Sequence, residues 1–417
     1  MKKRRTRPFE SHQTNGPVHS SWAPFERRAG GLADAAAEFP AGSGAAEPRA
    51  DASNASGKAQ GTNLSASHDP QGAGGEPRTM YDVICIGAGP TGLACAIEAK
   101  RAGMSALVID KGCLCNSLYH YPTNMLFFTT PERMEIGDLP MTTGGGKPTR
   151  AEALKYYRRA VEHYAVDVRL YETVGQIEGA DGDFLVHTRA VHGGAAHAYR
   201  SRKIVIATGY YDLPNYLGVP GEELPTVSHY FTDPHPYWNQ DVVVIGGKNS
   251  AAEAALDLFR AGARVTLIHR DAELGKNLKF WVRPDIENRI RAGEIQALFK
   301  THVTRIEPGR VWVKNSSNHE KEIPAAQVFA MTGYHPDFEF LERQGIKLDS
   351  RTRRPQIDVE TLETNVPGIY VAGVVVGGLQ TGEIFIENGR FHGRQIVAAM
   401  AGRGRVAEPA PVAPPGE

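Results

Sequence analysis

Residues 81–92 read Y-D-V-I-C-I-G-A-G-P-T-G, an apolar strand that runs directly into three closely spaced glycines. Gly87 permits the sharp bend from strand to helix, Gly89 lets the backbone approach a pyrophosphate, and Gly92 lets the helix pack close to the strand. Exposed N–H groups at the start of such a helix bind phosphate. The stretch therefore predicts a dinucleotide-binding unit whose helix covers about residues 91–102.

A second strand, S-A-L-V-I-D at 105–110, follows the helix after Gly103 and ends in Asp110. This is the position, about twenty residues after the glycines, where a carboxylate accepts hydrogen bonds from ribose hydroxyls. Pro90 and Thr91 at the helix start and Lys111 after the acid complete the predicted contacts. The alternative is an ordinary glycine turn with a surface aspartate, and the combination of strand, helix and acid favours the dinucleotide site.

A second signature begins at residue 241, where D-V-V-V-I-G-G-K-N-S-A leads into a predicted helix at 251–261 and a strand at 264–268. Lys248 stands at the position of the second glycine. Its ammonium group either contributes charge to a phosphate or points to solvent while its backbone makes the contact. The predicted contacts at this turn are Gly246, Gly247, Lys248, Asn249 and Ser250.

The end of the strand at 264–268 carries His269 and Arg270 where the first unit has an acid. An acid would repel a 2′-phosphate, whereas an arginine binds one through paired charge-assisted hydrogen bonds. This position therefore predicts NADPH rather than NADH, with Lys276 and Lys279 placed to assist. The alternative is a surface arginine without a ligand.

Small residues also end three further predicted strands: K-I-V-I-A-T-G at 203–209, V-F-A-M-T-G at 328–333 and N-V-P-G-I-Y-V-A-G-V at 365–374. The last is followed by G-G-L-Q-T-G at 377–382 and a predicted helix at 383–399. Each turn alone could serve packing, but their order around two glycine signatures favours cofactor contacts. The predicted contacts here are Thr208, Gly209, Gly373, Val374, Gln380 and Thr381.

Composition limits the class of protein. The chain has 417 residues, 41% of them hydrophobic, and zero formal net charge, which gives no reason to expect nucleic acid as a partner. Its four cysteines, all between Cys85 and Cys115, form no disulfide framework and favour a reducing, cytoplasmic compartment. No apolar run reaches the length of a membrane span, and no metal site is predicted.

The two ends differ in composition from the rest. Residues 1–79 are rich in Ala, Gly, Ser and Pro without helical or strand periodicity, which predicts a disordered tail. Met80 stands directly before the first strand, so the alternative is a start codon assigned too far upstream. The proline-rich residues 403–417 predict a second disordered tail.

The order of these elements predicts an α/β fold with two doubly wound Rossmann-like dinucleotide-binding domains, the second inserted in the first. The predicted outer domain comprises residues 80–211 and 335–402, and the inserted domain comprises residues 212–334. This layout resembles that of the thioredoxin-reductase-like flavoproteins, and the chain is most similar to the bacillithiol-disulfide reductase family, often called YpdA. The similar strings are N-S-L-Y-H-Y-P-T-N-M-L-F-F at 116–128, M-E-I-G-D at 134–138, G-Y-Y-D-L-P-N-Y-L-G-V-P-G-E at 209–222, V-V-V-I-G-G-K-N-S-A-A-E-A-A-L at 242–256 and F-I-E-N-G-R-F-H-G at 385–393.

The resemblance implies FAD on the outer domain, NADPH on the inserted domain, and reduction of the disulfide of a low-molecular-weight thiol. It also implies a homodimer. Asn116, Tyr119 and Tyr121 fall in a predicted loop after Asp110 that would lie along the flavin; their alternative role is packing and loop hydrogen bonding.

The chain departs from the family at Thr91, because family members commonly have a cysteine there, in G-P-C-G, that is proposed to exchange with the substrate disulfide. A threonine hydroxyl cannot form a mixed disulfide. Cys113 and Cys115 form a C-x-C that is either redox-active or a partly buried structural pair, and Cys85 and Cys95 are predicted to be packing residues.

Three functions therefore remain open at this point. The first is an NADPH-dependent, FAD-containing reductase of a small disulfide. The second keeps both cofactors but reduces ferredoxin, flavodoxin or a quinone, which needs no protein thiol. The third is a flavin- or NADPH-binding redox sensor without turnover.

Overall fold

The computed structural model describes residues 79–402. The predictions for the two tails therefore lie outside the described residues, apart from Thr79. Within the described part of the chain, no helix is both long and apolar enough to cross a bilayer.

The first sheet contains seven strands in the order β3-β2-β1-β6-β5-β4, with β17 also paired to β6. Strands β3, β2, β1, β6 and β17 are parallel, whereas β4, β5 and β6 form an antiparallel extension. The bounds are β1 Met80–Ile86, β2 Ala106–Asp110, β3 Asp167–Leu170, β4 Glu172–Ala180, β5 Asp183–Ala190, β6 Ala196–Ile206 and β17 Ile369–Val371. The apolar residues of β1 and β2 are buried because both faces of this sheet are covered.

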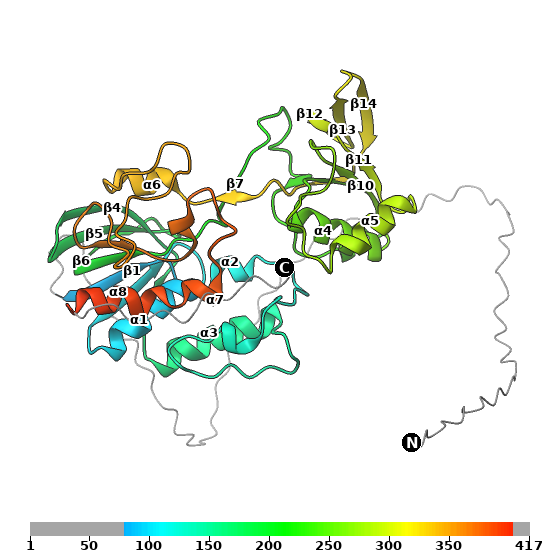
Figure 1. The fold of residues 1–417 in the computed structure, drawn as a ribbon. Coiled ribbons are helices and arrows are strands. Elements are labelled where there is room, and N and C mark those ends of the chain that lie inside the picture. The colour runs from blue at the N-terminus through cyan, green and yellow to red at the C-terminus, as the bar shows by residue number, and fades with distance from the viewer. Residues whose placement is uncertain (1–78, 403–417) are drawn as a thin grey trace, which may run out of the picture. The chain divides into compact units, whose positions relative to one another are not determined.

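Helices α1, α3 and α8 contribute to the core on one face of this sheet, and α6 packs on the other (Figure 1). A capping box between Thr149 and Glu152 fixes the start of α3. The helical bounds are α1 Pro90–Arg101, α2 Asn116–Tyr119, η1 Pro131–Arg133, α3 Arg150–His163, α6 Phe338–Arg343, η3 Gly373–Gly377, α7 Ile386–Gly389 and α8 His392–Met400.

The second sheet contains five strands, all parallel, in the order β11-β10-β9-β15-β8. Helices α4 and α5 pack on one of its faces through a separate apolar core. The bounds are β8 Val227–Ser228, η2 His235–Tyr237, β9 Asp241–Ile245, α4 Asn249–Arg260, β10 Arg264–Ile268, α5 Arg283–Arg291, β11 Gln296–Leu298 and β15 Gln327–Ala330.

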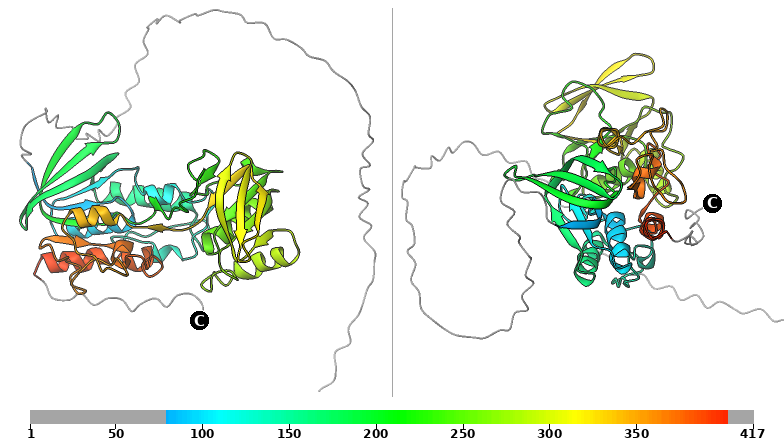
Figure 2. Two further views of the ribbon diagram at one scale, coloured as in Figure 1. Left: turned by 90° about the horizontal axis from the view of Figure 1, so that it is seen from above. Right: turned by 90° about the vertical axis from the view of Figure 1, so that its left-hand side faces the viewer.

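A three-stranded antiparallel sheet covers the other face of the second sheet (Figure 2). It comprises β12 Thr301–Glu307, β13 Arg310–Asn315 and β14 Glu320–Pro324. Val303, Val311 and Ile323 pack against Val243 and Ile268 of the parallel strands. The parallel sheet is therefore enclosed on both sides, as its continuous apolar strands require.

The chain passes between the two sheets twice, and the two passages are paired. Strands β7 (Leu213–Pro214) and β16 (Tyr334–His335) form a two-stranded antiparallel ladder. Next to it, the Thr332 hydroxyl donates to the Asn215 carbonyl at 2.6 Å, and the Asn215 amide donates to the Gly333 carbonyl at 2.9 Å. The predicted class, α/β with two Rossmann-like units, is confirmed; the exact domain bounds stay a prediction.

Two local predictions were wrong. The helix expected at 383–399 is interrupted, since α7 ends at Gly389 and α8 begins at His392. Asn388 and Gly389 have low helix propensity, and Gly389 packs closely against Thr91. The expected loop at Asn116 is the short helix α2.

Candidate cofactor and substrate site

The first glycine turn has the geometry that a phosphate cradle requires. Gly87 has φ +112°, and a Cβ on it would lie 2.4 Å from the Ala207 carbonyl oxygen. A Cβ on Gly92 would lie 1.9 Å from the Gly87 oxygen, so β1 and α1 approach too closely for any side chain. By contrast, no atom lies within 4 Å of a Cβ placed on Gly89, which leaves open space at the turn. The residues present therefore fit a pyrophosphate at Gly89.

Two further features of this turn suit a dinucleotide. No side chain caps the N-terminus of α1 and its first turn has no acidic residue, so its N–H groups remain available to an anion. The Asp110 carboxylate accepts from the amides of Ala88 at 2.6 Å and Gly112 at 2.7 Å. Burial raises the pKa of Asp110, although these two hydrogen bonds oppose the shift. The acid thus connects the glycine turn to the end of β2.

The second glycine turn repeats the geometry with one difference. Gly246 has φ +144° and lies against the Met331 carbonyl, with a Cβ-to-oxygen distance of 2.5 Å. Gly247 lies on the His269 ring, whose atoms would be 2.3 Å from a Cβ at that position. Lys248 is the N-cap of α4 in an extended conformation, with an exposed side chain. The His269 ring therefore packs directly against the backbone of this turn.

The two neighbouring side chains at the end of β10 differ in burial and in charge. The His269 ring is buried, and this desolvation lowers its pKa, which favours the neutral imidazole. Arg270 is exposed beside it, and no ion pair joins it to a carboxylate within residues 79–402. A guanidinium that is permanently charged and free of an acidic partner suits a 2′-phosphate.

Both turns open onto a single cavity of about 1430 Å³. All of the predicted cofactor contacts line it except Gly92, Lys111, Tyr119 and Gln380. Gly92 is buried behind the turn, Lys111 forms an ion pair with Asp212 at 3.0 Å, and Tyr119 and Gln380 are exposed. One small-ligand pocket usually occupies 300–1,000 Å³, so this cavity has room for more than one ligand.

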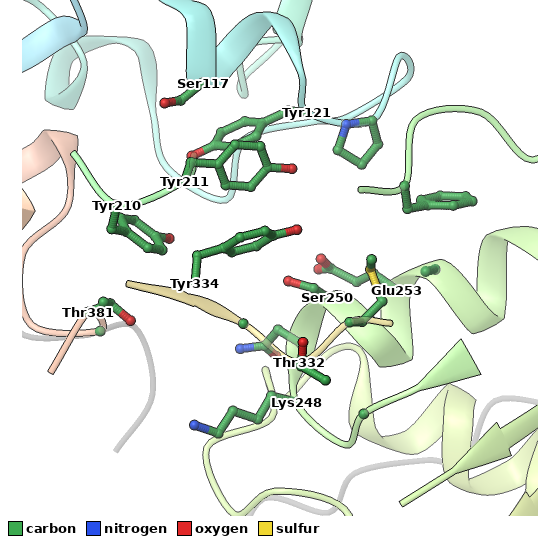
Figure 3. Close-up of a pocket in the computed structure, with 18 of the residues that line it drawn as sticks. Ser117, Tyr121, Tyr210, Tyr211, Lys248, Ser250, Glu253, Thr332, Tyr334 and Thr381 are labelled. Atoms are coloured by element: carbon green, nitrogen blue, oxygen red, sulfur yellow. The ribbon is translucent and has the colours of Figure 1, made fainter. Parts of the chain in front are cut away.

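A group of tyrosines lies in the wall of this cavity; Tyr121 was predicted to lie there along the flavin, and sequence reasoning missed the others. Figure 3 shows Tyr121, Tyr210, Tyr211 and Tyr334 gathered together, with Ser117 on one side and the α4 residues Ser250 and Glu253 on the other. The Tyr211 ring centroid lies 5.0 Å from that of Tyr121 and 4.5 Å from that of Tyr334. The sequence signal for the other three is position, because Tyr210, Tyr211 and Tyr334 follow the Gly209 and Gly333 turns directly.

Thr91 lies at the cavity wall between two glycines. Its Oγ1 would be 3.2 Å from a Cβ on Gly373 and 3.0 Å from a Cβ on Gly389. The side chain therefore occupies a narrow slot between α1, η3 and α7. Thr91 also lines the cavity.

None of the four cysteines has the environment of a reactive thiolate. All four are free, and Cys85, Cys95 and Cys115 are buried, which raises their thiol pKa values. Cys113 is partly exposed, and desolvation followed by the Asp110 charge raises its pKa too. Cys85 and Cys95 are packing residues, as predicted. Thiolate chemistry is disfavoured at every one of these positions.

His392 supports the Gly373 turn from outside the cavity. Its Nδ1 accepts a hydrogen bond from the Gly373 amide at 3.0 Å, which requires that nitrogen to be unprotonated. Desolvation by burial lowers the pKa of His392 to about 4. The ring is therefore neutral near pH 7 and holds Gly373 at φ +74°.

This contact predicts a loss of stability in acid. The pKa of His392 is about 4 in the folded state and about 6.5 in the unfolded chain. The contribution of the neutral ring to the free energy of unfolding is therefore fully present above pH 6.5 and decreases as the pH falls towards 4. Between these values the free energy of unfolding should fall by up to about 3 kcal/mol more in the wild type than in His392→Asn. Asparagine keeps an acceptor for Gly373 but does not titrate. Urea unfolding across this pH range measures the difference, and parallel curves would contradict it.

Comparison with known proteins places these features in context. The profile of the pyridine nucleotide-disulphide oxidoreductases matches residues 84–373. The chain is 46% identical over 321 residues to bacilliredoxin reductase Bdr of Bacillus subtilis, covering 77% of this chain and 97% of that relative. A solved structure of bacillithiol disulfide reductase Bdr (YpdA) from Bacillus cereus is 44% identical, with a TM-score of 0.75, and the match covers 78% of this chain and 99% of that one. A ferredoxin–NADP reductase of Ignicoccus hospitalis is 26% identical over 70% of this chain and 90% of that relative.

Proposed function

The chain belongs to the bacillithiol-disulfide reductases of the pyridine nucleotide-disulphide oxidoreductase family, and we propose that it passes electrons from NADPH through FAD to a disulfide acceptor. The family uses FAD and NADPH as cofactors. The observation that supports the proposal most directly is the single cavity into which both glycine turns open. The acceptor would be bacillithiol disulfide, a related small disulfide, or a protein such as bacilliredoxin.

The two glycine turns would each bind one of the two cofactors. The turn at Gly89, with Asp110, Thr208 and Gly373, would hold FAD. The turn at Gly246, with Arg270, would hold NADPH. FAD when bound supplies acceptance of a hydride from NADPH and two-electron delivery to the acceptor. The protein would supply placement and charge, and the tyrosines would form part of the cavity wall around the ligands.

Thr91 sets a limit on how the disulfide is reduced. A hydroxyl cannot exchange with a disulfide, and the thiol pKa values of the buried Cys115 and the partly exposed Cys113 are both raised. We therefore propose that the acceptor is reduced without a covalent link to the protein. The balanced reaction is NADPH + H⁺ + disulfide → NADP⁺ + two thiols.

We expect Thr91→Cys to convert this reaction to a covalent route. Cysteine lacks the threonine methyl group, so its sulfur has room in the slot beside Gly373 and Gly389. Intact-mass measurement should find no substrate adduct on the wild type and one adduct on the variant. Disulfide turnover should rise by about tenfold, equivalent to about 1.4 kcal/mol of barrier.

Thr91→Ser is the matched control, because it removes the same methyl group but keeps a hydroxyl. It should behave as the wild type does. An adduct on wild-type Cys113 or Cys115 would show that the C-x-C carries the chemistry instead, and a Cys113→Ser, Cys115→Ser double variant identifies it.

The acceptor class is tested in one anaerobic experiment. The purified protein is reduced with NADPH and then offered bacillithiol disulfide, oxidised bacilliredoxin, ferredoxin and a quinone in turn. Reoxidation by a disulfide supports the proposal. Reoxidation by ferredoxin or quinone alone would select the second candidate, which Thr91 and the similarity to ferredoxin–NADP reductase favour. The homodimer and the cytoplasmic location are also part of the proposal, and sedimentation velocity tests the first.

A further inference from the structure

An aromatic rim surrounds part of the cavity mouth and is not needed for either glycine turn. It is formed by Leu126, Phe128, Phe280, Trp281 and Phe385, with Lys147 and Lys279 over its rings. These residues come from separate segments of the chain. Leu126, Phe128, Lys279, Trp281 and Phe385 line the cavity, whereas Phe280 and Lys147 lie outside it.

Ring contacts and cation–π contacts connect most members of the rim into one surface. The Phe128 and Phe385 rings meet edge to face with centroids 5.8 Å apart. The Lys279 ammonium lies 5.4 Å from the centroid of Phe128 and 5.7 Å from that of Trp281. Lys147 lies 5.2 Å from the Trp281 centroid. Lysine and aromatic side chains therefore alternate along the rim.

The rim is unusually exposed for its composition. Leu126 is 60% exposed, Phe280 65%, Phe385 47% and Trp281 39%. Single exposed apolar residues are ordinary, but a group of them at the mouth of a cavity marks an interaction site. Aromatic side chains surrounded by polar groups are typical of the centre of a protein–protein interface. Because Phe280 lies outside the cavity, a ligand confined within the cavity cannot cover it.

The charges on the rim favour a partner whose contact surface is negatively charged. Lys279 forms an ion pair with Glu253 at 2.7 Å, but no carboxylate pairs with Lys147 in the described part of the chain. Lys147 follows Gly144, Gly145 and Gly146 and holds its charge over Trp281, at the outer side of the rim. An acidic surface would neutralise this charge on binding.

We propose that the aromatic rim is the docking surface for a small acidic redox protein that presents its own disulfide to the cavity. This rests on the proposed disulfide reductase function. Its electron balance is NADPH + H⁺ + partner disulfide → NADP⁺ + partner dithiol. Docking at the mouth brings the partner's disulfide to the opening without any thiol of this chain.

The test uses the full-length FAD-containing protein, with oxidised bacilliredoxin as protein acceptor and ferricyanide as small acceptor. Phe280→Ala and Lys147→Glu alter the rim outside the cavity. Each should raise the KM for bacilliredoxin by about tenfold, which is the loss of affinity that truncating a central interface residue typically causes. Each should leave ferricyanide turnover unchanged. Added salt should raise the wild-type KM for bacilliredoxin and have less effect on Lys147→Glu.

Trp238→Ala is the matched control, because Trp238 is 69% exposed and does not line the cavity. It should leave both KM values unchanged. Unchanged bacilliredoxin KM values in both rim variants would overturn the docking proposal, as would absence of wild-type binding to bacilliredoxin by calorimetry. A wild-type dimer that dissociates in Phe280→Ala would assign the rim to a second copy of the chain and also overturn it.

Failure of the underlying function gives a different result. If the protein reduces ferricyanide but no disulfide of any size, the disulfide reductase proposal fails. If it reduces bacillithiol disulfide but neither binds nor reduces bacilliredoxin, only the docking proposal fails.

Discussion

Gly92→Ala is expected to yield protein without bound flavin and with a large loss of stability. The new Cβ would lie 1.9 Å from the Gly87 carbonyl oxygen, which is a backbone atom and cannot rotate away. Gly87 is itself fixed by its amide hydrogen bond to Ile109 at 2.8 Å. The turn must therefore open, at a cost of about 2 kcal/mol or more in the free energy of unfolding. The ratio of absorbance at 450 nm to that at 280 nm reports flavin content, and thermal unfolding reports stability.

Gly89→Ala is the matched control in the same turn. A Cβ on Gly89 meets no atom within 4 Å, and the residue has φ −74°, so the fold should be kept. The methyl group would instead occupy the open space assigned to the pyrophosphate. We expect near-wild-type thermal stability of the flavin-free protein, with weakened FAD binding. A yellow Gly92→Ala protein with wild-type stability would contradict the assignment of this turn.

Arg270→Ala is expected to remove the preference for NADPH over NADH. A hydrogen bond to a charged group contributes about 1.5–3 kcal/mol, so the KM for NADPH should rise roughly 10- to 150-fold. The kcat/KM for NADH should remain unchanged, because NADH carries no 2′-phosphate. Steady-state kinetics with both coenzymes and ferricyanide as acceptor measure this directly.

Arg291→Ala tests whether general loss of positive charge explains such a result. Arg291 lies at the end of α5, donates to Asn288 at 2.8 Å and does not line the cavity. It should leave both coenzymes unaffected. If Arg270→Ala retains the wild-type ratio of NADPH to NADH activity, the guanidinium is a surface group and coenzyme choice depends on other residues.

The parts of the fold that were predictable are those encoded by local sequence. Each glycine turn combines an apolar strand, residues that tolerate positive φ and an uncapped helix, all within about thirty consecutive residues. Asp110 and Arg270 were placed by counting along the same units. The structure puts both at strand ends on the cavity, as the parallel arrangement requires.

The parts that were not predictable depend on contacts between distant segments. Thr91 reads as a helix-start residue, and only the approach of Gly373 and Gly389 encloses it in a slot. The strands β12, β13 and β14 alternate weakly, and their role as cover for the second sheet follows from packing rather than pattern. Tyr211 and Tyr334 are 123 positions apart and meet only because β7 pairs with β16.

That pairing has a consequence for how the chain can be rearranged. Pro214 and Tyr334 are directly opposed in the β7–β16 ladder, so the segment between them leaves and returns at adjacent points. Its two ends need no linker to span a gap between them. We therefore expect that residues 215–333 can be exchanged as one segment, or given new termini, while the β7–β16 ladder remains as the fixed junction.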